Sequence, residues 1–391
     1  MEGDFIKISD WLLLLSWIYG AGVRLRNQMF EMGMLKSRSF DIPVISVGNI
    51  TVGGSGKTPH VEYLINLLRD KVKVAVLSRG YKRKSKGYML ATADTPMSDI
   101  GDEPYQMKKK FADIYVAVDK NRCHGIDQLT TNEETSDTDV ILLDDAYQHR
   151  YVKPGVNILL VDYHRLIMYD KLLPAGRLRE PQKGKARADI VIVSKCPADL
   201  KPMEFRVITK AMNLFPYQKL YFTTLKYGSL RPIYGGEDRK LDTLTGDTSI
   251  LLLTGIASPQ QMIVDLKPYT ERITPLTFPD HHQYTDADID RINAEFEAMK
   301  GNDKMIVTTE KDNARLCGME GLSDEVKKNI YVLPVEVGFM LDQEEDFNEN
   351  IIGYVRKNSR NSILAKAKDD NKSDNSDNSG NRTRTISFRN N

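Results

Sequence analysis

The sequence predicts an α/β protein: a parallel sheet with helices on both faces, joined by a β linker to a second, smaller α/β lobe. Three observations support this fold class. Short, continuous apolar runs recur between helical stretches, as expected for strands that are buried on both faces of a parallel sheet. A Gly-rich loop stands between the first apolar run of the body and a helical stretch. The length of 391 residues, at roughly 150 residues a domain, allows two to three folded units.

The composition excludes several classes of protein. Lys and Arg total 55 and Asp and Glu total 54, so the chain lacks the basic excess of a nucleic-acid coat protein. A mean hydropathy of −0.42 argues against a polytopic membrane protein. The three cysteines lie far apart and form neither a disulfide framework nor a CxxC metal knuckle. The histidine spacing, without HxxxH or HExxH, indicates no structural zinc site.

The N-terminal segment, residues 1–30, contains an uncharged run at residues 11–23, WLLLLSWIYGAGV. Thirteen helical residues span about 20 Å, which is too short to cross a bilayer. Acidic residues precede the run where a signal peptide is positively charged. Trp11 and Trp17 lie in the run and basic residues follow it, a pattern typical of a helix in the headgroup layer. A buried N-terminal helix of a soluble domain is the alternative.

The first lobe is expected to cover residues 31–220. After a Gly-rich turn at residues 51–58, a helical stretch covers residues 61–68. Apolar runs that we interpret as strands lie at residues 43–47, 72–77, 114–118, 140–143, 158–161 and 190–193. Because these runs are continuous rather than alternating, both faces of the sheet should be covered.

The remaining elements form the linker, the second lobe and a tail. Residues 221–234 are polar and β-like and are the expected linker. The second lobe is expected over residues 235–355, with strands and helices at residues 249–253, 259–266, 273–278, 286–299, 304–307 and 330–335. Thr285 before acidic residues is typical of a helix N-terminus. Residues 356–391 are rich in Asn, Ser, Asp and Lys and should be disordered.

The Gly-rich loop has the pattern of a phosphate-binding P-loop, which makes the first lobe P-loop NTPase-like. Its glycines let several backbone N–H groups point at one phosphate, and the following helix N-terminus favours negative charge. The Lys places a positive charge on the β- and γ-phosphates and the Thr hydroxyl can bind Mg²⁺. One departure is a β-branched Thr51 where the generic motif has Gly. The expected ATP-binding residues are Thr51, Val52, Gly53, Gly54, Ser55, Gly56, Lys57 and Thr58.

A second signal is the apolar run that ends in two carboxylates, Asp144 and Asp145. An acid at the carboxyl end of a buried strand is the Walker B arrangement, which reaches the Mg²⁺ on the nucleotide. A plain turn is the alternative for this Asp pair. The sequence does not decide which of the two binds the metal.

Seven blocks carry a family resemblance. They are residues 46–59 (SVGNITVGGSGKTP), 77–81 (LSRGY), 100–104 (IGDEP), 144–150 (DDAYQHR), 173–181 (LPAGRLREP), 278–282 (FPDHH) and 308–312 (TTEKD). In this order they closely resemble the tetraacyldisaccharide 4'-kinase family of lipid A biosynthesis, from about residue 15 to about residue 337.

The resemblance implies a lipid kinase that transfers the γ-phosphate of ATP, with Mg²⁺, to the 4'-hydroxyl of a tetraacyl glucosamine disaccharide 1-phosphate. It also implies an enzyme held by its N-terminal helix on the cytoplasmic face of the bacterial inner membrane. An acceptor with four acyl chains stays in the bilayer. The resemblance therefore favours membrane contact through that helix over a buried helix. No nucleic acid and no obligate protein partner are expected.

The resemblance makes Asp102 the candidate catalytic base, paired with His281, and Lys57 the third catalytic residue. An Asp–His pair keeps the acid ionised and the imidazole oriented. Because His281 belongs to the second lobe, the lobes must close to bring the pair together. The alternatives are that Asp102 only caps a helix and that His281 is a loop residue without a role.

Further site residues follow from the same blocks. Glu103 is expected to join Thr58 and the two Walker B acids around Mg²⁺. Arginine suits bidentate recognition of phosphate. For Arg177, Arg179 and Glu180, a solvated surface loop is the alternative interpretation. The expected substrate-binding residues are Arg79, Gln148, Arg177, Arg179 and Glu180.

Two other classes compete with the kinase interpretation. A P-loop switch or metal-insertion chaperone would use a guanine-reading NKxD motif or a Cys/His cluster, and the sequence has neither pattern. A membrane-associated nucleotide-binding module without activity leaves the blocks around Asp102 and His281 unexplained. ATP consumption with and without an acylated disaccharide 1-phosphate separates these classes.

Overall fold

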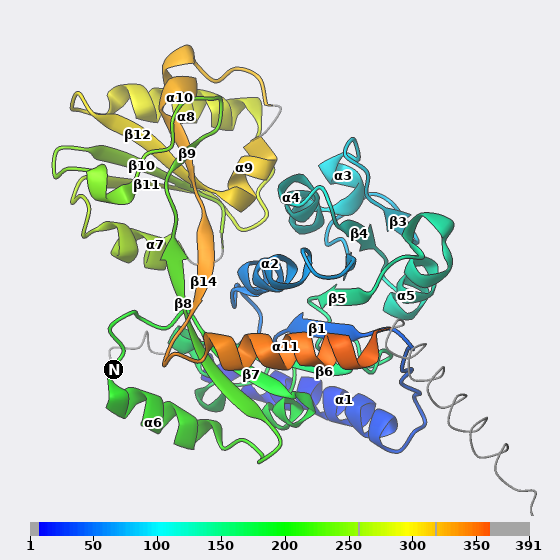
Figure 1. Cartoon of the computed structure of the whole chain (residues 1–391). Helices are drawn as coiled ribbons and strands as arrows, with labels where there is room; N and C mark the ends of the chain where they lie inside the picture. The colour runs from blue at the N-terminus through cyan, green and yellow to red at the C-terminus, as the bar shows by residue number, and fades with distance from the viewer. Residues whose placement is uncertain (1–7, 257–258, 317–318, 360–391) are drawn as a thin grey trace, which may run out of the picture.

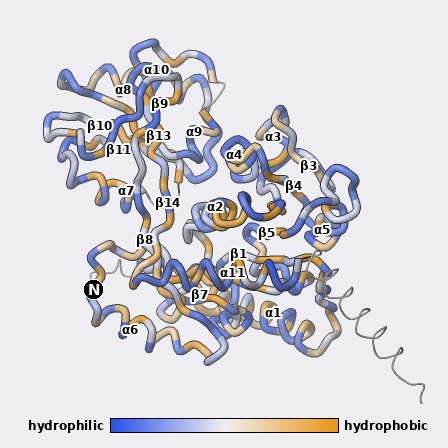
Figure 2. The backbone as a smooth tube through the Cα atoms, in the orientation of Figure 1, coloured by the Kyte–Doolittle hydropathy of each residue, from blue (hydrophilic) through white to orange (hydrophobic). Residues whose placement is uncertain are grey.

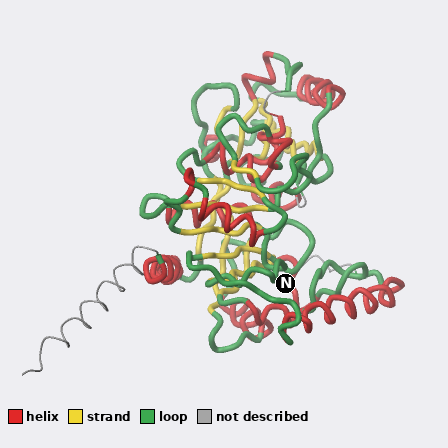
Figure 3. The backbone as a smooth tube through the Cα atoms, turned by 90° about the vertical axis from the view of Figure 1, so that its right-hand side faces the viewer, coloured by secondary structure: helices red, strands yellow, loops and turns green. Residues whose placement is uncertain are grey.

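The computed structural model describes residues 8–256, 259–316 and 319–359, and the chain forms two lobes, each built around its own sheet (Figure 1). The disordered tail was expected over residues 356–391, and residues 360–391 of it lie outside the described residues. The view turned by 90° shows the strands of both sheets flanked by helices (Figure 3). The predicted class, an α/β protein with a large parallel sheet, is therefore confirmed.

The first lobe holds a nine-stranded sheet that is parallel except at its two edges. Its strands are β1 (Val44–Gly48), β2 (Val74–Ser78), β3 (Met89–Leu90), β4 (Tyr115–Val118), β5 (Val140–Asp144), β6 (Val156–Asp162), β7 (Ile190–Ser194), β8 (Lys219–Tyr227) and β14 (Val335–Phe339). Their order is β14-β8-β7-β6-β1-β5-β2-β4-β3. Because β1, β2 and β5 are neighbours, the loops after them share one edge of the sheet.

The second lobe holds a five-stranded sheet. Its strands are β9 (Arg231–Pro232), β10 (Ser249–Thr254), β11 (Ile273–Thr277), β12 (Lys304–Thr309) and β13 (Ile330–Leu333), in the order β11-β10-β12-β13-β9. Only β9 is antiparallel to its neighbour. The apolar runs predicted for this lobe coincide with β10, β11, β12 and β13.

Helices cover both sheets. In the first lobe they are α1 (Leu13–Glu31), α2 (Lys57–Leu68), α3 (Met97–Ile100), α4 (Asp102–Lys110), α5 (Arg122–Thr131), α6 (Pro202–Met212) and α11 (Glu344–Asn358). In the second lobe they are α7 (Pro259–Leu266), α8 (Asp286–Ala298), α9 (Glu310–Leu316) and α10 (Asp324–Asn329). Short 3₁₀ turns are η1 (Asp10–Leu12), η2 (Glu133–Thr135), η3 (Tyr163–Arg165), η4 (Ile167–Tyr169), η5 (Gln182–Arg187) and η6 (Leu241–Thr243).

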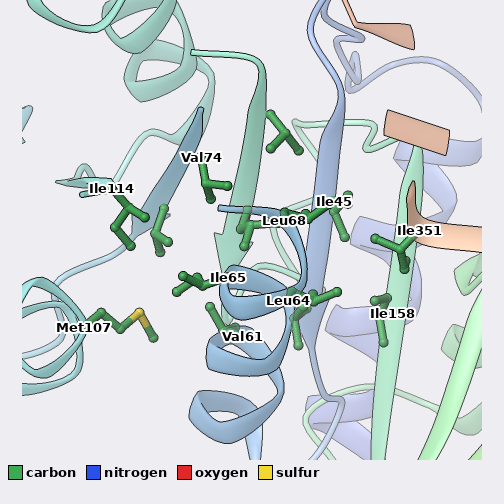
Figure 4. Packing of buried hydrophobic residues seen from close by; sticks show 14 of the residues in the cluster. Ile45, Val61, Leu64, Ile65, Leu68, Val74, Met107, Ile114, Ile158 and Ile351 are labelled. Carbon is green, nitrogen blue, oxygen red and sulfur yellow. The ribbon is translucent and has the colours of Figure 1, made fainter. Parts of the chain in front are cut away.

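The main core of the first lobe lies between α2 and the sheet (Figure 4). Val61, Leu64 and Leu68 recur at helical spacing on α2 and pack with Ile45 of β1 in the same buried cluster. Full burial of one such side chain stabilises the fold by roughly 1.5–3 kcal/mol. This packing fixes the start of α2, and with it the end of the Gly-rich loop.

The C-terminal boundary differs from the expected one. The second lobe was expected to reach residue 355, but β14 pairs with β8 and leads the chain back to the first lobe. Phe347, Ile351 and Val355 form one apolar stripe of α11 and are buried in the first lobe's core, whereas the rest of this helix is largely hydrophilic (Figure 2). The linker therefore has two strands, and β8 begins as a full member of the large sheet. Since α11 continues to Asn358, the tail does not start at residue 356.

Helix α1 docks on the first lobe through a narrow face. The Ser16 hydroxyl donates to the backbone oxygen of Leu172 at 2.9 Å, and a Cβ at Gly20 would lie 2.7 Å from Leu172 Cδ1. The opposite face of the N-terminal segment is exposed and carries both tryptophans, Trp11 at 82% and Trp17 at 72% exposure. The N-terminal helix is thus neither fully buried nor long and apolar enough to span a bilayer, and no other helix of the described residues meets that condition.

Candidate active site between the lobes

The Gly-rich loop is held in shape by side chains of neighbouring elements. Gly53 and Gly56 have φ angles of 112° and 77°, a region in which only glycine is unstrained. The Asn49 amide donates to Ser55 Oγ at 2.7 Å, and Ser194 Oγ at the end of β7 donates to the Ser55 carbonyl at 2.9 Å. Since these contacts form within the protein itself, the loop is pre-organised to receive a phosphate.

The departure from the generic motif at Thr51 has a structural reason. Thr51 forms an antiparallel bridge with Leu178, and the Val52 amide donates to the Arg177 carbonyl at 2.8 Å. The backbone at Thr51 is therefore extended, a conformation that a β-branched residue favours. The same bridge fixes Arg177 and Arg179 beside the phosphate-binding loop.

Several predicted residues converge at the end of β5. Lys57 Nζ lies 3.6 Å from Asp145 Oδ1, and Arg179 Nη1 lies 3.7 Å from Asp145 Oδ2. Arg179 also donates to the Gln148 side-chain oxygen at 3.3 Å. The P-loop lysine, one Walker B acid and two of the expected substrate-binding residues thus form one connected group.

Asp144 is the more deeply buried Walker B acid. Its Oδ2 accepts a hydrogen bond from Ser78 Oγ at 3.2 Å, while its Oδ1 has no hydrogen-bond partner among the described residues. Burial raises the pKa of Asp144 to about 7, and the negative charges of Glu103 and Asp145 act in the same direction. A carboxylate with a free oxygen among other acids is suited to a cation.

Few side chains near the end of β5 are available as ligands for a metal ion. The described part of the chain contains no group of three or more His, Cys, Asp or Glu residues that could hold a metal ion. Magnesium needs no such cage, because it is commonly bound by one or two carboxylates together with water and substrate phosphates. The Thr58 hydroxyl at the start of α2 and the carboxylates of Asp144, Asp145 and Glu103 are the donors available for that role.

Asp102 lies at the contact between the two lobes. It is the first residue of α4, it is buried, and its Oδ2 lies 2.9 Å from Nδ1 of His281 in the second lobe. The two residues expected to meet are therefore in contact. The Asp102 side chain also accepts a hydrogen bond from the Glu103 amide at 3.2 Å, so it contacts its own helix start as the alternative interpretation required.

Two further cations of the second lobe reach the same carboxylate region. Arg315 Nε donates to Asp102 Oδ2 at 3.2 Å, and Arg315 Nη2 contacts the same oxygen. Lys311 Nζ lies 3.4 Å from Glu103 Oε1 and 3.5 Å from Nε2 of His281. Burial alone raises the pKa of Asp102, but the His281 hydrogen bond and the charges of Lys311 and Arg315 outweigh it and hold the pKa well below its usual range.

The cleft between the lobes contains a cavity of about 220 Å³. Residues 54–58 of the P-loop line one side of it together with Lys195, Glu103 and Lys311. The apolar part of its lining comes from the linker strands and the second lobe and consists of Leu225, Tyr227, Met262, Leu333 and Val335. A cavity with a phosphate-binding end and an apolar end has the character of a nucleotide site.

Some predicted residues lie elsewhere or remain without contacts. Glu180 is buried against α1, where Arg187 donates to its two oxygens at 3.1 and 2.9 Å and Asn27 donates to it at 3.4 Å. This pairing is structural, and the predicted role of Glu180 in substrate binding stays a prediction. Arg79 is exposed after β2, and Arg177 is exposed close to Gly53.

Arg315 is the residue that sequence reasoning missed. The TTEKD block at residues 308–312 was recognised, but the helix that follows it was not extended to the arginine. A signal was present, because Asp312 and Arg315 have the i, i+3 spacing of a helical ion pair. Sequence reasoning also missed that Lys195 supports the P-loop. Its Nζ contacts the Gly54 carbonyl and lies 2.8 Å from Asp162 Oδ2.

Comparisons with known proteins agree with this geometry. The family described as Tetraacyldisaccharide-1-P 4'-kinase matches residues 8–356. A tetraacyldisaccharide 4'-kinase of Phocaeicola vulgatus is 60% identical over 363 residues, which are 93% of this chain and 99% of that protein. One from Bacteroides thetaiotaomicron is 54% identical over 373 residues, covering 93% of this chain and 98% of that protein.

A solved structure is similar over both lobes. A crystal structure of LpxK from Aquifex aeolicus in complex with ATP matches with a TM-score of 0.66 and 30% sequence identity. The match covers 88% of this chain and 98% of that one.

Proposed function

The chain belongs to the tetraacyldisaccharide 4'-kinase family, and on that premise we propose which of its residues carry out the reaction. It is a lipid kinase that transfers phosphate from ATP to the 4'-hydroxyl of a tetraacyl disaccharide 1-phosphate, a step of lipid A biosynthesis. The observation that carries the assignment of roles is the cleft. The P-loop and Glu103 line it, Lys57 joins the P-loop to the Walker B acid Asp145, and the Asp102–His281 pair lies next to the lining residues Glu103 and Asp280.

The P-loop holds the triphosphate. Backbone N–H groups of residues 53–58 and the N-terminus of α2 surround the phosphates, and Lys57 neutralises the charge on the transferred group. The apolar wall around Tyr227 and Met262 receives the base of the nucleotide. Such positioning and charge neutralisation are most of what catalysis of phosphoryl transfer requires.

Magnesium fits the carboxylates at the end of β5. The partnerless Oδ1 of Asp144, the raised pKa of this acid and the nearby Thr58 hydroxyl support a divalent cation at this position, with Asp145 and Glu103 as further donors. When bound, the ion neutralises the charge that develops on the phosphate oxygens.

Asp102 is the group that accepts the proton of the 4'-hydroxyl, and His281 orients it. A carboxylate with a low pKa suffices for this step, because the acceptor oxygen bonds to phosphorus only weakly in a loose transition state and loses its proton late, when the new O–P bond has made it strongly acidic. Arg177 lies beside the P-loop, Arg179 lies near Asp145, and Arg79 is exposed after β2; in this proposal they supply positive charge for a phosphate of the acceptor.

The exposed face of the N-terminal segment brings the enzyme to the lipid. Trp11, Leu14, Trp17 and Ile18 form an apolar surface at helical spacing, and a tetraacylated acceptor resides in a bilayer. We therefore place the enzyme on the cytoplasmic face of the inner membrane, bound to the membrane surface rather than spanning it.

The kinase assignment is tested by mass spectrometry of the lipid product. Wild-type protein, ATP, Mg²⁺ and an acylated disaccharide 1-phosphate should yield a product with one additional phosphate on the 4'-position. Lys57→Ala should abolish this product, whereas Lys300→Ala, at an exposed position of the second lobe, should retain it. ATP hydrolysis that is indifferent to the lipid would instead support a P-loop switch.

Vesicle flotation tests the membrane surface. The double variant Trp11→Ser with Trp17→Ser should lose most of its binding to vesicles of anionic phospholipid, because it removes the two largest exposed apolar side chains of this segment. Val264→Ser, which removes an exposed apolar side chain of the second lobe, is the matched control and should float like the wild type. Equal flotation of all three proteins would contradict the proposal.

A further inference from the structure

Three consecutive carbonyl groups of the P-loop, those of residues 54–56, are each held by a side chain. Lys195 Nζ contacts the Gly54 carbonyl, and Ser194 Oγ donates to the Ser55 carbonyl at 2.9 Å. In a planar trans peptide the C=O points opposite to the N–H of the next residue. The N–H groups that follow these carbonyls therefore point away from the side chains that hold them. A P-loop presents these same N–H groups to phosphate.

The third carbonyl, that of Gly56, is held by the buried His60 of α2. Nδ1 of His60 lies 2.7 Å from this carbonyl oxygen, and Nε2 lies 3.0 Å from Thr223 Oγ1. Because a carbonyl can only accept, Nδ1 carries the proton and donates, so Nε2 accepts a hydrogen bond from the Thr223 hydroxyl. The backbone N–H of His60 donates to the same Gly56 carbonyl at 3.3 Å. Both ring nitrogens are thus satisfied, and the Gly56 peptide is held by two donors.

Thr223 belongs to β8, the strand that runs from the large sheet into the linker. It is buried and pairs with Phe339 of β14, so its position is fixed by the sheet. Further along the same strand, Leu225 and Tyr227 belong to the apolar lining of the cavity between the lobes. His60 therefore connects the phosphate-binding loop with the strand that carries part of the apolar lining.

Packing of α2 does not require an imidazole at this position. Most other buried positions of the helix are aliphatic, namely Val61, Leu64, Ile65 and Leu68. An apolar pair of the same shape in place of a buried hydrogen-bonded pair is often nearly neutral for stability, because the desolvation cost disappears together with the bond. A buried imidazole that bonds to two segments of the nucleotide site therefore points to a role in holding that site.

We propose that His60 is a positioning residue for ATP, which fixes the last peptide of the P-loop and ties the loop to β8. With the Gly56 carbonyl held, the N–H of Lys57 is directed to the opposite side, where a phosphate is received. Because β8 also carries Tyr227, the phosphate end and the apolar end of the cavity are set relative to each other before the nucleotide binds. Such pre-organisation lowers the ordering cost of binding. This inference rests on the proposed role of the P-loop in holding the triphosphate.

The test is the dissociation constant of the full-length protein for ATP with Mg²⁺, measured by calorimetry, together with kcat and the KM for each substrate. His60→Phe keeps a ring but has no donor or acceptor. It should weaken ATP binding by about tenfold, because it leaves two buried groups without their partner. KM for ATP should rise in parallel, whereas KM for the lipid should stay unchanged. His60→Asn places an amide nitrogen near the position of Nδ1 and should recover most of the lost affinity.

A second variant tests the other end of the contact. Thr223→Val removes the hydroxyl but keeps the shape of the side chain, and it should weaken ATP binding by about threefold, since one hydrogen bond is lost. In the His60→Asn background it should have no further effect, because the shorter side chain does not reach Thr223. Thr209→Val, which removes an exposed threonine hydroxyl of α6, is the matched control and should bind ATP like the wild type.

Unchanged ATP affinity in folded His60→Phe and Thr223→Val would overturn the proposal, even if both variants melted at a lower temperature, because His60 would then only pack α2. If His60→Phe does not fold, unchanged affinity in His60→Asn and Thr223→Val overturns it equally. Lys57→Ala separates the two levels. Wild-type ATP affinity in Lys57→Ala would overturn the proposed role of the P-loop, whereas lost affinity there with unchanged affinity in the other variants would overturn only the role of His60.

Discussion

Two buried aspartates lie near Glu103, which lines the cleft between the lobes, and they have opposite surroundings. Asp144 ends a strand of the first lobe and lies among the acids Glu103 and Asp145, and its pKa is raised to about 7. Asp102 begins a helix of the same lobe, but its neighbours are His281, Lys311 and Arg315 of the second lobe, and its pKa is held well below the usual range.

The difference lies in the neighbours, since both carboxyl groups are largely removed from water. Asp144 is surrounded by negative charge and has one oxygen without a partner, so it is suited to a cation that comes from outside the protein. Asp102 receives its positive charges from the protein itself, so it stays ionised without a metal. The proposed metal site therefore belongs to one lobe, whereas the proposed base has contacts from both.

The largest expected effect comes from removing the charge of the base. Asp102→Asn should lower kcat by about 10²–10⁴-fold and leave the affinity for ATP nearly unchanged, because general base catalysis contributes an effect of that size. Steady-state assays of the phosphorylated lipid and direct nucleotide binding measure the two quantities. Asp242→Asn, in a turn of the second lobe, is the control. A variant at position 102 with near-normal turnover would remove Asp102 from this role.

The effect of the corresponding substitution at the proposed metal site, Asp144→Asn, should depend on the Mg²⁺ concentration. Asp144→Asn should reduce turnover by at least about tenfold at limiting Mg²⁺ and recover part of it at high Mg²⁺, because a neutral amide binds the ion more weakly. The dependence of kcat on Mg²⁺ concentration is the measurement. Asp102→Asn should instead be insensitive to Mg²⁺, and equal sensitivity of both variants would erase the proposed difference between the two acids.

Stability should depend on pH in opposite directions at the two acids. The folded pKa of Asp144 is above its unfolded value of about 3.9, so without Mg²⁺ its contribution to the unfolding free energy is lost as pH rises from about 4 to about 7. The folded pKa of Asp102 is depressed, so its contribution is present above the unfolded pKa and is lost as pH falls below it.

Urea unfolding at pH 5 and pH 8, with and without Mg²⁺, checks this prediction. Wild type should lose stability toward pH 8 only without Mg²⁺, and Asp144→Asn should be less sensitive to both variables. If the wild type loses stability toward pH 8 and Asp144→Asn loses the same amount, another group causes the loss.

The smallest effect is expected at the edge of the contact between the lobes. Lys110 Nζ lies 2.7 Å from Glu62 of the first lobe and 2.8 Å from Glu310 of the second, and it is partly exposed. Lys110→Met should change kcat/KM by less than about fivefold, because partly exposed ion pairs contribute about 0–1 kcal/mol. Assays at low and high salt measure it. A loss as large as that of Asp102→Asn would mean that lobe contact in general, rather than the charge on Asp102, governs the rate.

Much of the fold was predictable because its signals are local. Continuous apolar runs marked the parallel strands, such as β5 and β10, and the Gly-rich loop stood in its required place between β1 and α2. The return of α11 to the first lobe was not predicted. Its stripe of Phe347, Ile351 and Val355 indicates a helix with one buried face, but nothing in the local pattern says which lobe covers that face.

The candidate site shows the same limit. Motif residues such as Lys57 and Asp144 could be predicted as candidates from the sequence, because phosphate chemistry requires them at fixed positions in the chain. Glu180 was assigned to the substrate, yet it pairs with Arg187 seven residues further on. Arg315 is 213 residues away from Asp102, so their contact follows only from how the two lobes pack.

The central claim is that neighbouring charges give the two aspartates opposite ionisation behaviour. ¹³C NMR of protein labelled at the aspartate carboxyl carbons tests it directly, with Asp102→Asn and Asp144→Asn as assignments. Without Mg²⁺, we expect one carboxyl that titrates near pH 7, disappears in Asp144→Asn and ceases to titrate there once Mg²⁺ is added. The Asp102 signal should stay ionised over the whole folded range. Titration of both groups together near the ordinary value of about 4 would contradict the account.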